Sequence, residues 1–169
     1  MNTQKLSLPT DERNALISGL VTDLLWHGKI ETTLAQAKAA SRIADRCITI
    51  AINACEDVIS EEKTATDSKG KETKTTVVKD GPKKLTARRK LMAILYDKQE
   101  EKGKNEKKSA YKARTEQIQH PLIERIFDDL APKYAKRAEE LGTKGGYTRV
   151  LKTSLRRGDN AQLAIVALV

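Results

Sequence analysis

The C-terminal end of the chain constrains the fold most, because two predicted strands follow one another there. Residues 147–152 alternate between polar and apolar side chains, and residues 163–169 are apolar almost throughout. Alternation is typical of a half-buried strand, and a short apolar run is typical of a strand covered on both faces or nearly so. The loop between them contains Arg156-Arg157-Gly158-Asp159. We therefore expect a C-terminal β-hairpin.

Helical periodicity dominates the first sixty residues. Apolar side chains in residues 11–27 form two neighbouring rows with a spacing of four: Leu16, Leu20 and Leu24, then Ile17, Val21 and Leu25. Thr10 is the predicted N-cap of this helix, and Gly28 is its predicted end. A short strand is expected at Lys29–Thr33, followed by a second helix from Thr33 to about Val58.

Further helices are expected in the second half. One begins near Thr86, with Leu85, Met92 and either Leu95 or Tyr96 facing inward and Arg88, Arg89 and Lys90 facing outward. Another begins at Pro121, and a third runs from Pro132 to Leu141. Because helices outnumber three short strands, the predicted class is α+β, with helices on one side of a small three-stranded sheet and the hairpin at the C-terminus.

The charge of the chain indicates a polyanionic partner. Lys and Arg number 32 against 23 Asp and Glu, which gives a net charge of +9. Residues 1–60 carry a net −1, residues 61–119 a net +7 and residues 120–169 a net +3. Such a balance is typical of proteins that bind nucleic acid.

Several other classes are not supported. The two cysteines, Cys47 and Cys55, lie eight residues apart on a predicted helix, so we expect two small buried side chains and neither a disulfide nor a zinc site. Residues 1–13 lack the apolar stretch of a secretory signal, and no apolar run approaches the ~20 residues of a membrane helix. His27 and His120 have no nucleophile at a suitable spacing, and residues 142–146 lack the spacing of a phosphate loop. We expect no enzyme, cofactor, metal or small-molecule substrate.

Basic side chains near the predicted hairpin are the first candidates for binding phosphate. They are Lys144, Arg149, Lys152, Arg156 and Arg157, with Tyr147 as a candidate for stacking on an exposed base. The alternative is a basic hairpin that only faces solvent. A second basic group is Lys83, Lys84, Arg88, Arg89 and Lys90. For residues 102–112 we favour a solvated face, because glutamates dilute the lysines.

Three stretches of the sequence resemble one protein family. They are Ala15 to Lys38, with His27-Gly28-Lys29-Ile30-Glu31-Thr32-Thr33 inside it; Leu130-Ala131-Pro132-Lys133-Tyr134; and Gly145-Gly146-Tyr147-Thr148-Arg149, continuing through Arg157-Gly158-Asp159-Asn160 to Val169. They resemble the bacterial-type ribosomal proteins of the large subunit that carry number seventeen in their naming series. The resemblance covers most of residues 13–59, 85–97 and 118–169.

This resemblance implies a structural protein of the large ribosomal subunit that binds 23S ribosomal RNA. It implies a cytoplasmic location on the ribosome, near the peptide exit tunnel and beside the family numbered thirty-two, with no catalysis and no cofactor. Arg149, Lys152, Arg156, Arg157 and Lys144 are then the first expected RNA contacts, and Tyr147 packs against a sugar or base. The second choices are Arg88, Arg89 and Arg13. A standalone DNA- or RNA-binding regulator is the alternative function.

The chain departs from the family pattern in two ways. Lys5-Leu6-Ser7-Leu8 stands where family members usually end a basic tail with lysine-leucine-glycine-arginine. Residues of about 60–84 and 98–117 look inserted into a single domain that spans residues 1–169. We expect the first insertion to be an exposed loop, with a small hairpin around Asp80-Gly81-Pro82 as a further option. The second is expected to be a disordered loop or a protruding charged helix.

Overall fold

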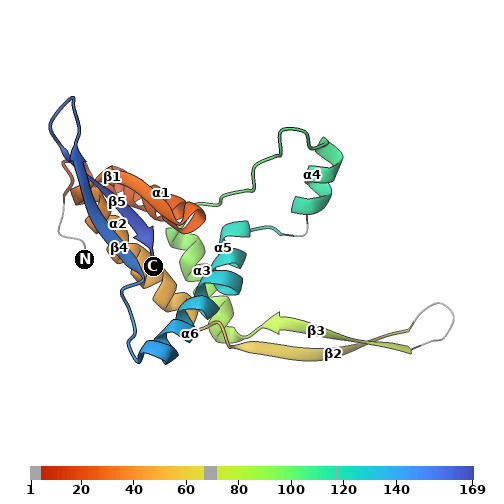
Figure 1. The fold of residues 1–169 in the computed structure, drawn as a ribbon. Helices are drawn as coiled ribbons and strands as arrows, with labels where there is room; N and C mark the ends of the chain where they lie inside the picture. The colour runs from red at the N-terminus through yellow and green to blue at the C-terminus, as the bar shows by residue number, and fades with distance from the viewer. Residues whose placement is uncertain (1–4, 67–71, 117) are drawn as a thin grey trace.

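The computed structural model of the chain describes residues 5–66, 72–116 and 118–169. Figure 1 shows a body in which helices cover one face of a small sheet, and two segments that leave this body. One segment is a two-stranded hairpin, which we call the arm (residues 58–80). The other carries a short helix, and we call it the outcrop (residues 98–117).

The first helix, α1 (Thr10–His27), ends where the sequence predicts but begins one position earlier. Pro9 occupies the N-cap position, so Thr10 is already helical and makes no cap with its side chain. At the other end, Gly28 has φ 80° and its N–H donates to the carbonyl of Leu24 at 2.8 Å. This left-handed conformation favours glycine, which confirms the predicted end of the helix.

Three strands form an antiparallel sheet in the order β1-β5-β4: β1 (Lys29–Thr33), β5 (Gln162–Leu168) and β4 (Thr148–Leu155). The predicted C-terminal hairpin is therefore confirmed. β5 is apolar almost throughout because it is the central strand. Its Ala164 and Val166 are fully buried against the helices, while residues between them on the open face are half-buried.

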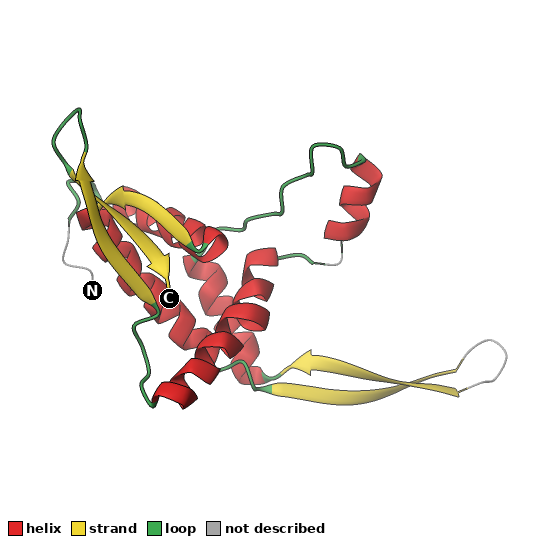
Figure 2. Ribbon diagram, viewed as in Figure 1, coloured by secondary structure: helices red, strands yellow, loops and turns green. Residues whose placement is uncertain are grey.

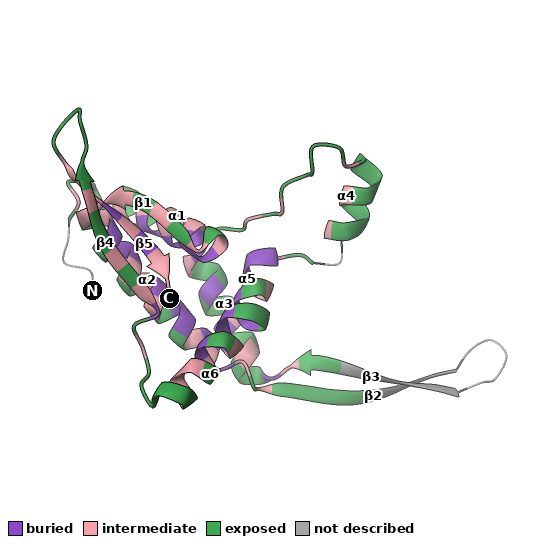
Figure 3. Cartoon of the chain, in the orientation of Figure 1, coloured by how far each residue is buried: buried purple, intermediate pink, exposed green. Residues whose placement is uncertain are grey.

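Helix α2 (Leu34–Ile52) packs on the inner face of the sheet together with α1. Its buried side is lined mostly by small side chains: Ala37, Ala39, Ala40, Ala44, Cys47, Ile48 and Ala51. Figure 3 shows this buried side facing the sheet and the other helices. The predicted α+β class, with helices on one side of a three-stranded sheet, is confirmed.

A second group of helices packs against α2. It consists of α3 (Pro82–Ile94), α5 (Pro121–Arg125), η1 (Ile126–Leu130) and α6 (Ala131–Leu141). The segment η1 is a π-helical turn, in which the N–H of Ala131 donates to the carbonyl of Ile126. The turn joins α5 to α6 without a break, and Leu122, Ile126 and Tyr134 along this stretch are all fully buried.

The inward face of α3 differs from the prediction. Leu85, Met92 and Tyr96 are 41%, 43% and 52% exposed. Leu91 and Leu95 are buried instead, together with Ala87. Leu95 is the only one of the predicted inward residues that the structure buries.

The first insertion is not the exposed loop that we expect from its composition. β2 (Val58–Thr66) and β3 (Glu72–Asp80) pair antiparallel, from Val58 opposite Asp80 to Thr66 opposite Glu72. Asp80-Gly81-Pro82 is the junction between β3 and α3 and not the tip of a hairpin. The abundance of Thr and Val in this polar segment favours a strand over a loop.

Asp57 closes the base of the arm. Its backbone carbonyl accepts a hydrogen bond from Gly81 N–H at 2.8 Å, and its Oδ2 accepts one from Lys83 N–H at 2.7 Å. A Cβ at position 81 would overlap the Asp57 carboxyl group, so this junction requires glycine. The carboxylate also satisfies N–H groups of the first turn of α3, where a negative charge is favourable.

The second insertion contains α4 (Lys108–Thr115), which resolves the alternatives in favour of a protruding charged helix. Within the described residues, no helix is long and apolar enough to cross a membrane. Both cysteines are unpaired thiols: Cys47 is buried, as expected, and Cys55 is half-buried.

The inward face of α3 is tested by two neighbouring substitutions. We expect Leu91→Ala to lower the free energy of unfolding by about 2–5 kcal/mol, because it opens a cavity at a fully buried position. Met92→Ala, its matched control, should change it by about 0.5 kcal/mol or less, as is usual at exposed positions. Urea denaturation followed by circular dichroism measures both. A larger loss in Met92→Ala would contradict the observed burial.

The two thiols should differ in reactivity. Burial raises the pKa of Cys47 to about 11, so only about one thiol in a thousand is ionised at pH 8. We expect iodoacetamide to modify Cys55 in the native protein and to reach Cys47 only after unfolding. Peptide mass spectrometry at successive times measures the two rates. Equal rates in the native protein would contradict the buried position of Cys47.

Candidate nucleic-acid interface

The two faces of β4 divide the predicted basic residues. Arg149 and Lys152 are three positions apart, and side chains alternate along a strand, so they point to opposite faces. Arg149 pairs with Ala167 of β5, and Lys152 pairs with Ala164, which is fully buried on the helix side. Both cationic side chains are exposed. They therefore serve two separate surfaces and not one cluster.

Arg149 shares the open face of the sheet with Lys29. Both residues pair with Ala167, one from each side of β5, so they lie in one row across the sheet. At the usual strand spacing their Cα atoms are about 10 Å apart. Lys29 is exposed, and the sequence analysis did not select it. The position of Lys29 opposite β5 can be identified only once the order of the strands in the sheet is known.

Lys152 points to the side on which α2 lies. On that helix, exposed basic residues recur every fourth position, at Lys38, Arg42 and Arg46. Lys38 borders a groove that is also lined by Ala161 and Gln162, at the start of β5. The first residue of this basic row thus lies beside the start of β5. This row was not predicted from the sequence, although its spacing of four is a signal of one helix face.

Hydrogen bonds fix α2 against β4 beneath this row. The hydroxyl of Thr148 donates to Asp45 Oδ1 at 3.0 Å, and it lies 2.7 Å from the hydroxyl of Ser41. Burial raises the pKa of Asp45, although the hydrogen bonds from Thr148 oppose this shift. The strand and the helix therefore present their basic side chains in a fixed relation.

The turn between β4 and β5 is ordered by one of its two arginines. Arg156 donates from Nε and Nη2 to both carboxylate oxygens of Asp159, at 2.8 and 2.5 Å. These hydrogen bonds lower the pKa of Asp159 to about 2. Asn160 has φ 56°, and its N–H closes the turn by donating a hydrogen bond to the Arg156 carbonyl. Arg157 is exposed and pairs with no acid that the structure describes.

Lys144 lies at the opposite end of the hairpin. The β4 strand separates it from Arg157, so the predicted basic residues are spread over the length of the hairpin, with Arg149 on one face of the sheet and Lys152 on the other. Lys144 is exposed on the rim of a groove of about 600 Å³ that also contains Glu56 and Glu139. The glycines beside it take left-handed conformations, with φ 102° at Gly145 and 62° at Gly146. Their carbonyls accept hydrogen bonds from Arg137.

Tyr147 does not offer a ring for base stacking. Its side chain is only 4% exposed, and its ring packs against that of Tyr134, with the centroids 5.0 Å apart. Arg137 lies over both rings. The Tyr147 ring is therefore part of the core and is not exposed for the expected contact with a base or sugar.

Arg88 is held in an ionic network. It pairs with Asp80 at the end of the arm and binds both carboxylate oxygens of Glu124 on α5, at 2.6 and 2.8 Å. Hydrogen bonds to Glu124 raise the pKa of Arg88, and its guanidinium also lies over the ring of Phe127. The predicted outward position of Arg88 is wrong, because it joins the arm, α3 and α5.

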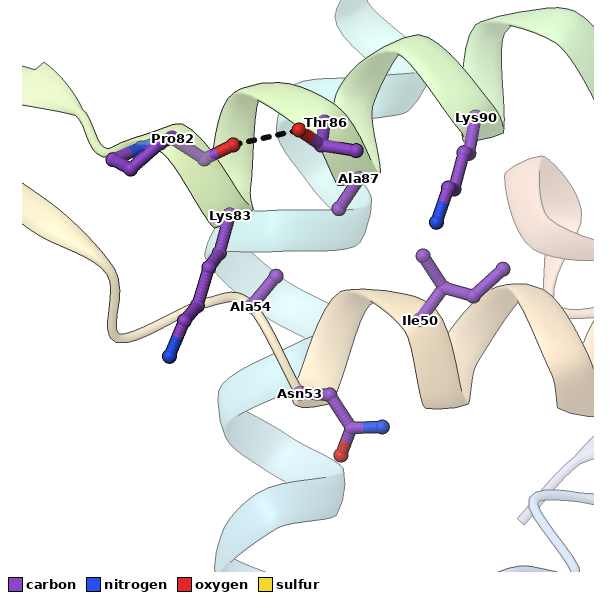
Figure 4. A pocket seen from close by; sticks show the side chains of 8 residues that line it. All are labelled: Ile50, Asn53, Ala54, Pro82, Lys83, Thr86, Ala87 and Lys90. Atoms are coloured by element: carbon purple, nitrogen blue, oxygen red, sulfur yellow. Dashed lines mark hydrogen bonds between the residues drawn. The ribbon is translucent and has the colours of Figure 1, made fainter.

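Of the other basic residues in this group, Lys84 pairs with Asp80 at 3.0 Å, and the remaining three are exposed. Arg89 is exposed and has no acidic partner in the described part of the chain. Lys83 and Lys90 flank a groove of about 530 Å³ between the start of α3 and the end of α2. Figure 4 shows both lysine side chains extending over this groove, with Ile50 of α2 and Asn53, which directly follows that helix, opposite. This groove continues the exposed basic surface from α2 to α3.

Arg13 lies in the first turns of α1 and is half-buried. Its Nε is buried and has no hydrogen-bond partner among the described residues. Among those residues, no group of three His, Cys, Asp or Glu side chains is placed to hold a metal ion.

Comparison with known proteins identifies the family of the chain. A model of the family described as ribosomal protein L17 matches residues 16–169. The chain is 34% identical to large ribosomal subunit protein bL17 of Acetivibrio thermocellus, with 98% of both chains covered. A protein of the same description from Clostridium botulinum (strain Eklund 17B / Type B) is 35% identical, with 98% of this chain and 96% of the relative covered. The family match and these relatives extend over nearly the whole chain, which therefore belongs to the ribosomal protein L17 family.

Proposed function

We propose that the chain is a structural protein of the large ribosomal subunit and that it binds 23S ribosomal RNA without catalysing a reaction. Its relatives are named as proteins of that subunit, which supports the assignment to the ribosome. The observation that carries the RNA contact is the set of exposed cations along the C-terminal hairpin, at Lys144, Arg149, Lys152 and Arg157. In bacteria this location is cytoplasmic.

The physical basis of binding is neutralisation of phosphate and recognition of folded RNA by shape. The exposed row of α2, at Lys38, Arg42 and Arg46, adds basic residues on the helix side of the sheet, to which Lys152 also points. We assign the first RNA contacts to this surface.

The resemblance of the sequence also suggests a place near the peptide exit tunnel, beside the family numbered thirty-two. In this chain the N-terminal segment adds little charge, since Lys5 and Arg13 are its only basic residues before Gly28. We infer that the hairpin and the helices replace the basic tail in contacting RNA.

Sedimentation tests the ribosomal assignment. A tagged form of the chain is expressed in a host that depends on it, as the only copy of this protein. It should co-migrate with the large subunit on sucrose gradients. A chain found only at the top of the gradient would contradict the assignment. Tight, sequence-selective binding to duplex DNA at near-physiological salt would instead favour a standalone regulator.

Charge reversal tests the hairpin surface. We expect Arg149→Glu with Arg157→Glu to weaken binding to 23S ribosomal RNA by about tenfold or more, because phosphate attraction becomes repulsion at two positions. The matched control reverses Lys133 and Lys136, two exposed lysines of α6 outside this surface. Filter binding measures both double variants. An equal loss in both would argue against a binding face on the hairpin.

Two adjacent arginines should separate folding from binding. Arg88→Gln removes the charged partner of Asp80 and Glu124, and we expect it to lower the free energy of unfolding by about 1–3 kcal/mol. Arg89→Gln should leave stability unchanged and weaken RNA binding. Thermal unfolding and filter binding distinguish the two. A destabilised Arg89→Gln protein would refute this division of roles.

A further inference from the structure

The two segments that leave the body differ in charge. The arm, residues 58–80, contains five basic and five acidic residues, so it has no net charge. The outcrop, residues 98–117, contains seven basic and four acidic residues. Only the outcrop therefore has the sign that a polyanion would attract.

Two of the acidic residues of the outcrop pair with an arginine of the outcrop itself. Arg114 on α4 pairs with Glu100, and its Nε also lies 3.3 Å from Glu106 Oε1. Glu106 Oε2 accepts a further hydrogen bond from Gly103 N–H at 3.1 Å. These two glutamates are thus occupied within the outcrop, while Glu101 and Glu116 remain exposed.

All the lysines of the outcrop except Lys98 are left without an acidic partner among the described residues. Five of them are exposed, and none forms an ion pair with an acid that the structure describes: Lys102, Lys104, Lys107, Lys108 and Lys112. Lys108 and Lys112 lie one turn apart on α4. Figure 3 shows the outcrop as an exposed segment away from the body. Arg114 thus pairs with Glu100 and Glu106, while these five lysines face solvent.

The outcrop is fixed where it joins the body. Lys98 Nζ lies 2.6 Å from Asp23 Oδ1 on α1, and Gln99 Nε2 donates to the Gln119 carbonyl at 3.1 Å. His120 Nδ1 lies 3.2 Å from Asp97 Oδ1, which joins the two ends of the segment. Farther from the body, the Tyr111 hydroxyl donates to the Glu100 carbonyl at 2.9 Å and holds α4 against the segment that precedes it.

We propose that the outcrop is a second RNA-binding surface, which contacts the phosphate backbone of folded RNA apart from the C-terminal hairpin. This inference rests on the proposed function and extends it. Composition alone favours a solvated face for residues 102–112, and the internal pairing of Glu100 and Glu106 changes that interpretation. Figure 1 shows α4 well separated from the β4–β5 hairpin, so the two surfaces bind different parts of the RNA.

The number of phosphate contacts is measurable as a salt dependence. Each lysine that displaces counterions contributes about 0.7–0.9 to the slope of log affinity against log salt concentration. We expect Lys108→Gln with Lys112→Gln to reduce that slope by about 1.4–1.8 for isolated 23S ribosomal RNA. The matched control is Lys133→Gln with Lys136→Gln on α6, which should keep the wild-type slope. Circular dichroism verifies that both double variants stay folded.

The outcomes separate this inference from the proposed function. If wild-type chain binds 23S ribosomal RNA and the Lys108/Lys112 variant keeps the wild-type slope, the outcrop is not an RNA surface. Loss of a cross-link from α4 to an acidic neighbouring protein, with an unchanged slope, would overturn the inference in favour of a protein partner. If wild-type chain fails to bind the RNA at all, the proposed function itself is wrong.

Discussion

Close packing around α2 is the constraint on which the other elements depend. Its inner side is built mostly from alanines, which let neighbouring backbones approach closely. As a result this one helix contacts all three strands of the main sheet and the helices α1, α3 and α6. A larger side chain at Ala40 or Ala44 would push several of these elements apart at once. The body of the protein is therefore organised around a helix that contributes little apolar volume of its own.

The same helix links the core to the candidate interface. Ser41 and Asp45 bind Thr148 on β4, and the neighbouring row of Lys38, Arg42 and Arg46 faces solvent beside this contact. One side of the helix thus packs in the core, and an adjacent side carries exposed basic residues. This arrangement explains how exposed basic side chains on α2 and β4 keep a fixed position relative to one another.

Much of the fold follows from local signals in the sequence. The turn at Arg156-Arg157-Gly158-Asp159 and the alternation before it are enough to predict the hairpin, and Gly28 marks the end of α1. The inward face of α3 is not predictable in this way. Leu85, Leu91, Met92 and Leu95 offer more than one apolar face, and packing against α2 and α5 selects the one that is buried.

The candidate site was only partly predictable, for a related reason. Tyr147 and Arg88 were selected by residue type, but their partners lie elsewhere in the sequence. Tyr134 buries the tyrosine ring, and Glu124, 36 residues away, engages the arginine. Arg149 and Arg157 are exposed because none of the described residues pairs with them. Residue type therefore identified the chemistry, while long-range pairing decided which groups are free to use it.

The pairing of Arg156 with Asp159 has a consequence for the thermodynamics of binding. A loop that must become ordered on its ligand loses conformational entropy at that moment, which subtracts from the affinity. This turn is already closed before any ligand arrives, since Arg156, Asp159 and Asn160 hold one another in place. Arg157 therefore approaches its partner from a preorganised support, and only its own side-chain rotamers remain to be restricted.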